Sequence, residues 1–436
     1  MNQQLTYKFQ LKRNNHLDNL CHHSKNLYNQ TIYIIKEYFD KTSKFLCYNE
    51  FEKIIKKTNN LEKEINYYKL PAQTSQQILR LIEKNWKSYF ASLKDYKKHP
   101  EKYFGQPQYP SFLRRKRNIL IFTNQNLHYK NNKLICKKFG INIKIPQKDY
   151  KDFSKFQQVR LIPKGDYYQV EIIYNQKIIR NKVDKKRMLF IDLGVNNLAA
   201  LTTNFVSKPI IINGRILKSV NQLFCKRHAR LKSIRTNGKN NKKIEDKIYF
   251  YHTKNMNKLS RKRSNYIENY LHNVSNYIVE YSLENKIGSV FVGDLVRLKQ
   301  NINLGKKNNQ NIQLIPIAKL KKQLQYKLKL IGIKYKNVEE NYTSKCSALD
   351  LEKIRKHKSY VGNRRFRGLF ISPKFGKINA DVNGSLNIGR KVIGNTFVKK
   401  LINSRVLYNP SKINILDNVD KAPKQTQQRS VKLLNL

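Results

Sequence analysis

Residues 190–203 have the sequence FIDLGVNNLAALTT, and this stretch decides how the second half of the chain is expected to fold. Met188–Ile191 is a short apolar run typical of a buried strand, Gly194 allows a tight turn, and Leu198–Thr203 predicts the second strand of a hairpin. The hairpin leaves the carboxylate of Asp192 at a strand end, which suits a metal-binding acid. Asp followed by glycine is also ordinary turn chemistry, so this motif alone favours neither interpretation.

A second acid with the same potential lies far downstream, in INADVNGSLNIGRKV at residues 378–392. Asp381, Asn383 and Gly384 precede a predicted amphipathic helix, where an Asp is also a common N-cap. A strand-end Asp, an acid on a later strand and an Asp opening a late helix are what two-metal phosphodiester cleavage needs. Such acids hold two divalent cations about 4 Å apart, of which one activates water and the other stabilises the leaving oxygen.

The charge balance indicates a polyanionic partner. The chain has 88 Lys and Arg against 29 Asp and Glu, a net charge of +59 over 436 residues. Because the basic residues are spread over the whole chain, nucleic acid bound in a long charged channel is expected. A membrane partner is not favoured, since the sequence has no run of about 18 apolar residues and no apolar signal-peptide core. Codon bias in an AT-rich genome adds Lys but does not explain the scarcity of acids.

The cysteines indicate neither disulfides nor zinc. All five lie far apart without a CxxC pair: Cys21, Cys47, Cys136, Cys225 and Cys346. This spacing predicts no disulfide framework and no structural zinc site, so a reducing cytoplasm is the expected setting. The 39% apolar content supports hydrophobic cores, and the length allows two or three domains.

The pattern along the chain predicts a multidomain α+β protein. An edge strand at 1–13 precedes helices at 17–39 and from 70, with Trp86 and Phe90 as core residues of the second helix. Short apolar runs at 103–174 are typical of a small antiparallel barrel. Alternating strands and helices follow a polar linker, and the residues from Pro410 have no periodicity.

Six segments then carry a specific resemblance, and they occur in this order: LPAQTSQQILRLIEKNWKSYF at 70, QPQYPSF at 106, FIDLGVNNLAALTT at 190, LKQNINLGKKNNQNIQLIPIAKL at 298, ENYTSKCSALD at 340 and NADVNGSLNIGRK at 379. In these segments the chain resembles the TnpB (OrfB) family of transposon-encoded RNA-guided nucleases, which is related to the type V CRISPR effectors. The resemblance covers nearly everything except the C-terminal tail.

The resemblance implies a split antiparallel wedge β-barrel with a helical recognition insertion, followed by a RuvC-like nuclease domain of RNase H fold. The expected domains are the first barrel strand at 1–14, the helical recognition domain at 15–102, the rest of the barrel at 103–182, the nuclease domain at 183–400 and a basic, disordered tail at 401–436. Within the nuclease domain, a zinc-less insertion that binds target nucleic acid is expected at about 343–379.

The family's activity is RNA-guided cleavage of DNA. The resemblance implies a guide RNA from the element's own end, a double-stranded DNA target beside a short element-specific motif, and Mg²⁺ or Mn²⁺ as the catalytic metal. A cytoplasmic, nucleoid-associated protein with no membrane partner is expected. The residues expected to contact nucleic acid are Arg114, Arg115, Lys116, Arg117, Lys299, Gln300, Lys306, Lys307, Thr343, Ser344, Arg364, Arg365 and Arg367.

One departure from the family concerns the second acid. The usual Glu, in a strand of the form I-x-x-E-D-L, falls on Gly293, and glycine cannot bind a metal. Asp294 is a poor substitute, because a shift of one residue along a strand turns the side chain to the opposite face.

A subgroup that this chain resembles, marked by KQ-x-I-x-LG-x-x-NNQ, places the acid on the following strand, which here gives Glu340. Neighbouring strands lie within about 5 Å, so this relocation is geometrically easy. The expected catalytic and metal-binding residues are therefore Asp192, Glu340 and Asp381. Glu339 is the alternative, with the opposite side-chain direction.

The other departure is the missing zinc finger. Typical relatives have two CxxC pairs before the final Asp, whereas this chain has only Cys346 there, so no zinc is expected. Arg364, Arg365 and Arg367 are expected to face nucleic acid without the metal, and a mobile lid is the alternative.

Three functions remain open from the sequence. The leading one is an active, magnesium-dependent RNA-guided DNA endonuclease. Because Gly293 replaces the usual Glu, a nuclease-dead RNA-guided DNA-binding protein, acting as a repressor or transposition regulator, is the main alternative. An RNase H-type enzyme that cuts its own transcript is the third, since contacts to the 2′-hydroxyl decide between DNA and RNA.

Overall fold

The structure is a computed structural model that describes residues 2–146, 153–235, 253–294, 305, 309–310, 313–366 and 368–415. The chain divides into two units after Gln176, and each is treated separately. The sequence predicts this boundary six residues later, after residue 182. In the part of the chain that the structure describes, no helix has the length and apolar character to cross a membrane.

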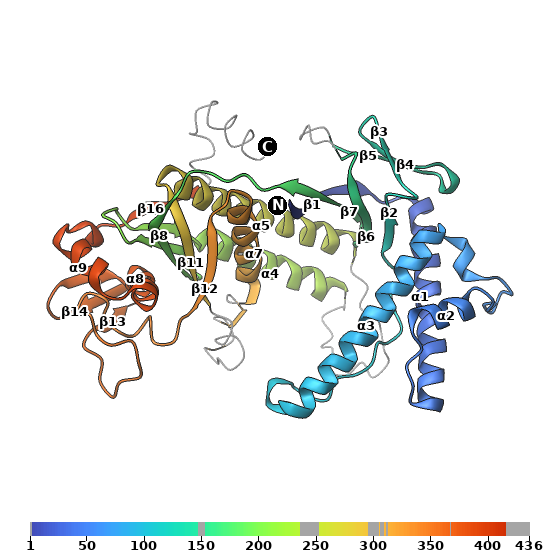
Figure 1. Cartoon of the computed structure of the whole chain (residues 1–436), viewed down its shortest axis with the longest axis horizontal. Helices are drawn as coiled ribbons and strands as arrows, with labels where there is room; N and C mark the ends of the chain where they lie inside the picture. Colours follow the sequence, from blue (N-terminus) through green and yellow to red (C-terminus); the bar gives the residue numbers. More distant parts are fainter. Residues whose placement is uncertain are drawn as a thin grey trace. The chain divides into compact units, whose positions relative to one another are not determined.

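The N-terminal unit combines a layer of helices with two small sheets (Figure 1). Its helices are α1 (Asn15–Thr42), α2 (Tyr48–Ile55), η1 (Asn66–Lys69), α3 (Ala72–Lys98), η2 (Pro100–Lys102) and η3 (Lys137–Phe139). Its strands are β1 (Asn2–Lys12), β2 (Leu120–Thr123), β3 (His128–Lys130), β4 (Lys133–Cys136), β5 (Ile141–Lys144), β6 (Phe156–Pro163) and β7 (Tyr167–Lys177).

The strands of this unit form two open sheets, in the orders β1-β7-β6-β2 and β3-β4-β5. The N-terminal strand therefore joins strands from the second half of the unit. Among the described residues the two sheets do not close into a barrel, and the split barrel stays a prediction. Strands β2 to β5 have only three or four residues each, and each pairs within its own sheet.

One hydrophobic core joins the helices to both sheets. Trp86 of α3 is fully buried, and its ring lies 5.5–6.0 Å from those of Phe39, Phe45, Phe90 and Tyr109. The interpretation of Trp86 as a core residue is therefore confirmed.

The C-terminal unit is built on a six-stranded sheet in the order β12-β11-β8-β9-β10-β16. Its strands are β8 (Asp184–Leu193), β9 (Asn197–Thr203), β10 (Ile210–Asn213), β11 (Ile287–Asp294), β12 (Lys334–Glu339) and β16 (Ser411–Ile413). Strands β8, β9 and β10 are antiparallel, whereas β11 pairs parallel with β8 and β12 pairs parallel with β11. A separate sheet contains β13 (Asn363–Phe366), β14 (Leu369–Ser372) and β15 (Gly376–Asn379).

Helices cover both faces of this sheet. They are α4 (Arg215–Arg235), α5 (Lys254–Glu284), α7 (Ile317–Leu330), α8 (Ala380–Ile393), α9 (Thr396–Asn403) and η6 (Val406–Tyr408). Leu189 and Ile191 of β8 pack in the core shared with α5 and α7, whereas Phe190 packs in the core shared with α8 and α9. Because side chains alternate along a strand, Asp192 is on the same face as Phe190, toward α8.

The predicted disordered tail at 401–436 is wrong for residues 401–415. Strand β16 pairs parallel with β10, with Ile210 opposite Ser411, and Ile415 is buried. A strand of three residues is too short to produce a periodic pattern, which is why the sequence did not indicate it. Residues 416–436 lie outside the described residues.

Candidate active site

Asp192 lies at the end of β8 and faces helix α8. Gly384 of α8 makes the close approach possible, because a Cβ at this position would lie 2.6 Å from Oδ2 of Asp192. Within the described residues, no group donates a hydrogen bond to the Asp192 carboxylate. A turn-forming Asp would bind backbone N–H groups, so ordinary turn chemistry does not account for this side chain.

Glu340 follows β12 and reaches back over the neighbouring strand. Gly293 is the register partner of Val338, and Val338 packs on the α8 side of the sheet. Glu340 is two residues beyond Val338 and therefore has the same side-chain direction. A Cβ on Gly293 would overlap the Glu340 carboxylate and would lie 2.8 Å from its Cγ. The carboxylate of Glu340 thus occupies the space above Gly293.

The same register shows why the neighbouring acids point elsewhere. Asp294 pairs with Glu339 in the register, on the opposite face from Gly293. Oδ1 of Asp294 lies 2.8 Å from Nζ of Lys321 on α7, and the exposed Glu339 accepts a hydrogen bond from Asn341. Neither acid faces α8.

Asp381 lies in the first turn of α8, but it is not the N-cap. Asn379 caps the helix, since its Oδ1 accepts from the backbone N–H groups of Asp381 and Val382. The Asp381 carboxylate instead accepts from Nδ2 of Asn197 at 2.6 Å and lies 3.5 Å from the Arg364 guanidinium. It is therefore free of the capping role that the sequence left open.

The acids have electrostatics typical of a cation site. Burial raises the pKa of Asp192 well above its usual value, and the charges of Glu340 and Asp381 raise it further. Burial also raises the pKa of Glu340 to about 7, and Asp294 adds to the shift. Oε1 of Glu340 is buried without a hydrogen-bond partner. Several carboxylates crowded in this way are stabilised by a divalent cation, for which carboxylate oxygens are the preferred ligands of Mg²⁺.

Buried polar residues of α8 hold this helix against the sheet and the loop after β12. Ser385 donates to the carbonyl of Phe190, and Asn383 and Asn387 both donate to the carbonyl of Cys346. These roles were not predicted from the sequence. Their signal was present, because polar residues on every face of a predicted buried helix need buried partners.

The guanidinium of Arg390 completes this network. It is buried and donates to the carbonyls of Ser347 and Glu352 and to the side chains of Asn387 and Asn395. It therefore links the last turns of α8 to the loop that follows β12.

Two of the residues predicted to bind nucleic acid have hydrogen-bond partners within the fold. Arg117 donates to Asp18 and to the carbonyls of Lys164 and Gly165, so its guanidinium is occupied. Thr343 is buried and donates to the carbonyl of Glu340 at 2.9 Å. That these two residues contact nucleic acid stays a prediction, and their partners within the fold are not visible in a basic run or a TS motif.

The other predicted contacts that the structure describes are exposed side chains: Arg114, Arg115, Lys116, Ser344, Arg364 and Arg365. Arg364 is the one that also lies beside the acids. Lys299, Gln300, Lys306, Lys307 and Arg367 lie outside the described residues.

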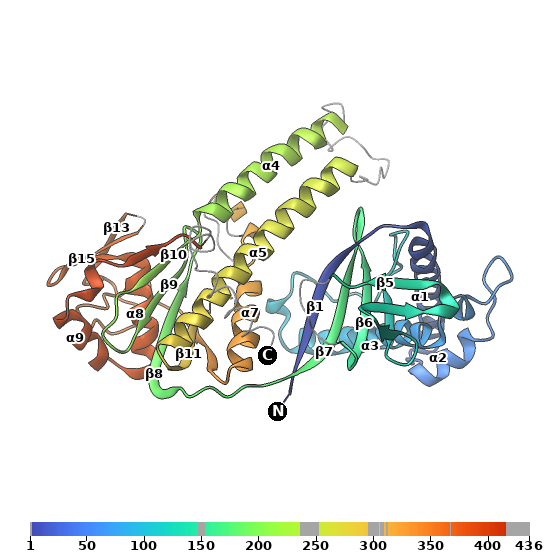
Figure 2. The same ribbon diagram turned by 90° about the horizontal axis from the view of Figure 1, so that it is seen from above.

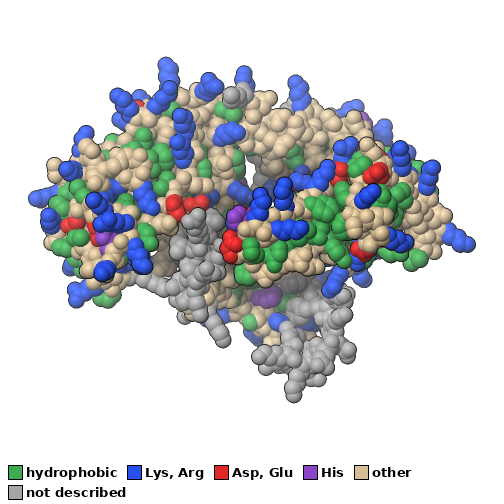
Figure 3. All heavy atoms as spheres, turned by 60° about the horizontal axis from the view of Figure 1, so that its bottom comes forward, with side chains coloured by type: hydrophobic (Ala, Val, Ile, Leu, Met, Phe, Trp, Pro, Cys, Tyr) green, Lys and Arg blue, Asp and Glu red, His purple; other side chains and the backbone are tan. Residues whose placement is uncertain are grey.

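A basic helical arm formed by α4 and α5 was not predicted from the sequence. These helices run side by side and extend beyond the sheet (Figure 2). Helix α4 contains no Asp or Glu, and α5 contains none before Glu268. The exposed cations along the arm are Lys226, Arg227, Arg230, Arg235, Lys254, Lys258 and Lys262. Figure 3 shows Lys and Arg scattered widely over the visible face, around fewer acids.

Two known sequence families match most of the C-terminal unit. Residues 168–299 match the family OrfB_IS605, described as "Probable transposase", and residues 318–388 match the Cas12f1-like TNB domain. The "TnpB-like protein ORF457" of Acidianus two-tailed virus is 24% identical over 356 residues, which cover 75% of this chain and 74% of that protein.

Solved structures with a similar fold include the protein of a Cas12f1-sgRNA-target DNA complex. It has a TM-score of 0.53 and 17% identity, and the match covers 85% of this chain and 81% of that one. The mini-RNA-guided endonuclease CRISPR-Cas_phi3 has a TM-score of 0.46 and 13% identity, over 94% of this chain and 93% of that one. At 17% identity, the similarity to the protein of the Cas12f1 complex shows a shared fold and nothing more.

Proposed function

We infer that this chain, a member of the TnpB family, is an RNA-guided endonuclease that cuts DNA by metal-dependent phosphodiester hydrolysis. The observation that carries the proposal is the position of Glu340. Its carboxylate lies above Gly293, at the point where the family's usual Glu would project from β11. In this proposal, Glu340, directly after β12, supplies the acid that the sequence lacks at residue 293.

The topology of the C-terminal unit supports a RuvC-like domain of RNase H fold. Three consecutive antiparallel strands, β8 to β10, lie beside two parallel strands, β11 and β12, with β8 in the centre. In this arrangement the ends of β8, β11 and β12 meet at one edge, where Asp192 and Glu340 lie. The split barrel remains a proposal, supported by the pairing of β1 with β7.

Asp192, Glu340 and Asp381 would hold the divalent metal ions. All are oxygen donors, and the buried Oε1 of Glu340 has no other partner. When bound, such metals supply a Lewis acid and an activated water for in-line hydrolysis. The chain's own residues position the acids: Asn197 orients Asp381, Thr343 fixes the turn after Glu340, and Gly384 leaves room for Asp192.

The exposed cations would hold the guide RNA and the DNA. Arg364 lies close enough to Asp381 to contact a phosphate bound at the acids. Arg114, Arg115 and Lys116 offer phosphate contacts in the N-terminal unit, and the basic arm offers others in the C-terminal unit. Contacts to phosphates carry no sequence information, which is consistent with specificity supplied by guide pairing.

The alternative is a guided DNA-binding protein without nuclease activity, which the glycine at residue 293 motivates. A matched pair of variants separates the two functions. The protein is co-expressed with RNA from its element's end and incubated with matched DNA in Mg²⁺. Glu340→Gln is expected to lower the cleavage rate by about a hundredfold or more, because a metal ligand is removed, while Glu339→Gln changes it less than about threefold. Wild-type protein that binds this DNA without cutting it, or equal cleavage by both variants, would overturn the proposal.

A further inference from the structure

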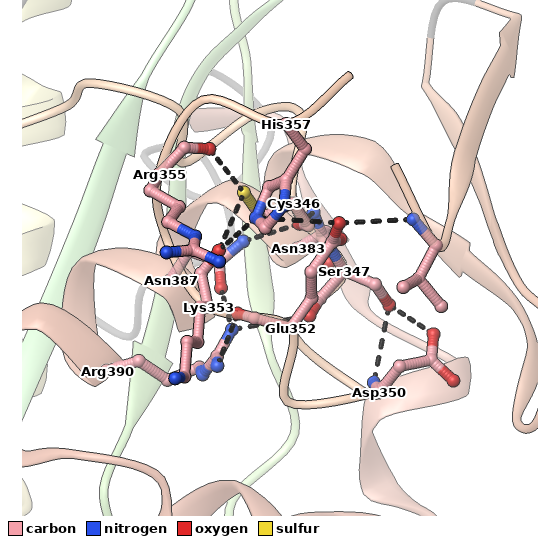
Figure 4. Close-up of polar contacts among 11 residues, drawn as sticks. Cys346, Ser347, Asp350, Glu352, Lys353, Arg355, His357, Asn383, Asn387 and Arg390 are labelled. Carbon is pink, nitrogen blue, oxygen red and sulfur yellow. Dashed lines mark hydrogen bonds and ion pairs between the residues drawn. The ribbon is translucent and has the colours of Figure 1, made fainter. Parts of the chain in front are cut away.

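A second cluster of metal-ligating side chains lies in the loop between β12 and β13, apart from the three acids. Cys346, Glu352 and His357 each direct one donor atom toward the others, and these atoms lie within 4.8 Å of one another (Figure 4). Cys346 and Glu352 are buried, and His357 is half-buried at the rim. A sulfur, an oxygen and a nitrogen donor converge on one point.

The spacing of the three donor atoms is somewhat wider than that of a tetrahedral zinc site. From the usual zinc–ligand lengths, ligand atoms around a tetrahedral zinc are about 3.5 Å apart. Nε2 of His357 lies 3.9 Å from Oε1 of Glu352, so small side-chain movements would complete the arrangement. Without metal, Nε2 donates to the carbonyl of Lys353 at 2.7 Å, and Sγ of Cys346 donates to the carbonyls of Lys353 and Arg355 at 3.5 and 3.6 Å. Metal binding would replace these hydrogen bonds, and a water would be the fourth ligand.

The backbone already orients the carboxylate for this role. Oε2 of Glu352 accepts from the N–H of Ser347 at 2.7 Å, and Oε1 accepts from the N–H of Val361 at 3.1 Å. Each carboxylate oxygen has a further lone pair, so these hydrogen bonds do not prevent metal binding. Hydrogen bonds to a ligating carboxylate are typical of protein metal sites.

The cluster is attached to the helix that carries Asp381. The carbonyl of Cys346 accepts from both Asn383 and Asn387 of α8. Arg390, also on α8, donates to the carbonyl of Glu352. A metal at the cluster would therefore stabilise the loop at the two points where α8 holds it.

We propose that Cys346, Glu352 and His357 bind one zinc ion, which fixes the loop between β12 and β13 against α8. This inference does not depend on the proposed nuclease activity. It revises the expectation of no zinc, which counted thiols alone, because carboxylates and imidazoles also bind zinc. On binding, Cys346 loses its thiol proton to solvent, and the imidazole proton of His357 moves to Nδ1 through solvent exchange, so one proton is released.

Cobalt titration of the full-length protein tests the site. Co²⁺ is added after chelator treatment, and thiolate ligation produces a charge-transfer absorption band that carboxylate ligands alone do not produce. We expect one Co²⁺ per chain with this band, displaced by Zn²⁺ and not by Mg²⁺. Zn²⁺ is also expected to raise the melting temperature. A folded wild-type protein without a thiolate band would overturn the proposal.

Variants assign the band to these residues. Cys346→Ser is expected to abolish the band, while Cys225→Ser, which removes a half-buried thiol on α4, leaves it intact. His357→Gln changes a rim residue and is expected to weaken Co²⁺ binding at least about tenfold. It is also expected to remove the thermal effect of Zn²⁺ in a protein that still folds. A band that survives Cys346→Ser, or unchanged affinity in His357→Gln, would contradict the site.

Discussion

The carboxylate of Glu340 lies where a side chain at Gly293 would have to be. A Cβ on Gly293 would lie 2.8 Å from Cγ of Glu340, so only one of the two positions can carry an acid. The glycine is in an extended strand and needs no unusual backbone conformation. Its small size, rather than its flexibility, is therefore what the structure uses.

A Glu placed at residue 293 should partly replace Glu340 in DNA cleavage. Gly293→Ala alone is expected to displace the Glu340 carboxylate and to lower the cleavage rate at least about tenfold, which corresponds to about 1.4 kcal/mol. Glu340→Ala should lower it about a hundredfold or more, and Gly293→Glu with Glu340→Ala should recover at least tenfold of this loss. Cleavage assays with matched DNA in Mg²⁺ measure all three. If the double variant is no better than Glu340→Ala, the two positions are not equivalent.

Magnesium binding should depend on pH through Glu340. Its pKa is raised to about 7 in the folded protein, so without metal the carboxyl group is mostly protonated below about pH 7. The stability that this group contributes is complete below its ordinary pKa of 4.5 and is lost as the pH rises through about 7. Magnesium requires the ionised form, so its affinity should rise up to about tenfold per pH unit and level off above pH 7.

The measurement is the Mg²⁺-dependent shift in melting temperature at pH 5.5, 6.5 and 7.5. The raised pKa of Asp192 acts in the same direction, so Glu340→Gln should flatten the pH dependence without abolishing it. An identical pH dependence in the wild type and the variant would show that Glu340 does not bind the metal.

Arg117 should contribute to the stability of the fold, whereas Arg115 should contribute to RNA binding. Arg117→Ala removes hydrogen bonds to Asp18 and to two backbone carbonyls, and it should lower the free energy of unfolding by about 2–3 kcal/mol. The exposed Arg115→Ala should leave stability within about 0.5 kcal/mol and weaken RNA binding. Urea unfolding and RNA titration separate the effects. Equal destabilisation by both variants would contradict the assignment.

Arg390 should be important for stability rather than chemistry. Arg390→Ala leaves the carbonyl of Glu352 without the guanidinium and the carbonyl of Ser347 with only the backbone N–H of Glu352, and the free energy of unfolding should fall by about 3 kcal/mol. Lys391→Gln is the control on the same turn, since its exposed ammonium donates to the carbonyls of Glu339 and Asn341. It should cost about 1 kcal/mol or less. Similar losses for both would show that Arg390 is not the main link between α8 and the loop.

The basic arm should contribute to the salt dependence of RNA binding. Lys254, Lys258 and Lys262 follow one face of α5 at intervals of four residues. Their joint change to Gln should reduce the slope of log affinity against log salt by about 2–3, since each neutralised phosphate adds about 0.7 to this slope for a single strand and about 0.9 for a B-form duplex.

The control for the arm removes the same charge elsewhere. Lys41, Lys56 and Lys87 each pair with a Glu four residues before them, so they are less available to phosphates. Their joint change to Gln should reduce the slope by less than about 1. A slope that falls equally in both triple variants would mean that the arm contributes only its net charge.

Elements with a clear hydrophobic period could be predicted from the sequence. The hairpin around FIDLGVNNLAALTT and the helices predicted at 17–39 and from 70 are present as β8–β9, α1 and α3. Because side chains alternate along a strand, the sequence also predicted that Asp294 points to the opposite face from residue 293. That Asp192, Glu340 and Asp381 form the catalytic set stays a prediction for the variants above.

What the sequence could not reveal depends on partners far along the chain. The hydrogen bonds of Arg117 to residues 164 and 165 cannot be found in a run of basic residues. Three-residue strands such as β16 have no period to detect. The cluster of Cys346, Glu352 and His357 mixes donor types within one loop, so a search for CxxC spacing misses it.

The relocation of the acid makes assembly of the candidate site depend on a loop. A Glu on β11 would be fixed on both sides by neighbouring strands, whereas Glu340 follows β12, at the margin of the sheet, and opens the loop that α8 holds through Cys346. Displacement of that loop, by nucleic acid or by release of a bound ion, would move the carboxylate that is proposed to bind the metal. With Glu340 as a ligand, the site would be complete only when the loop lies against α8.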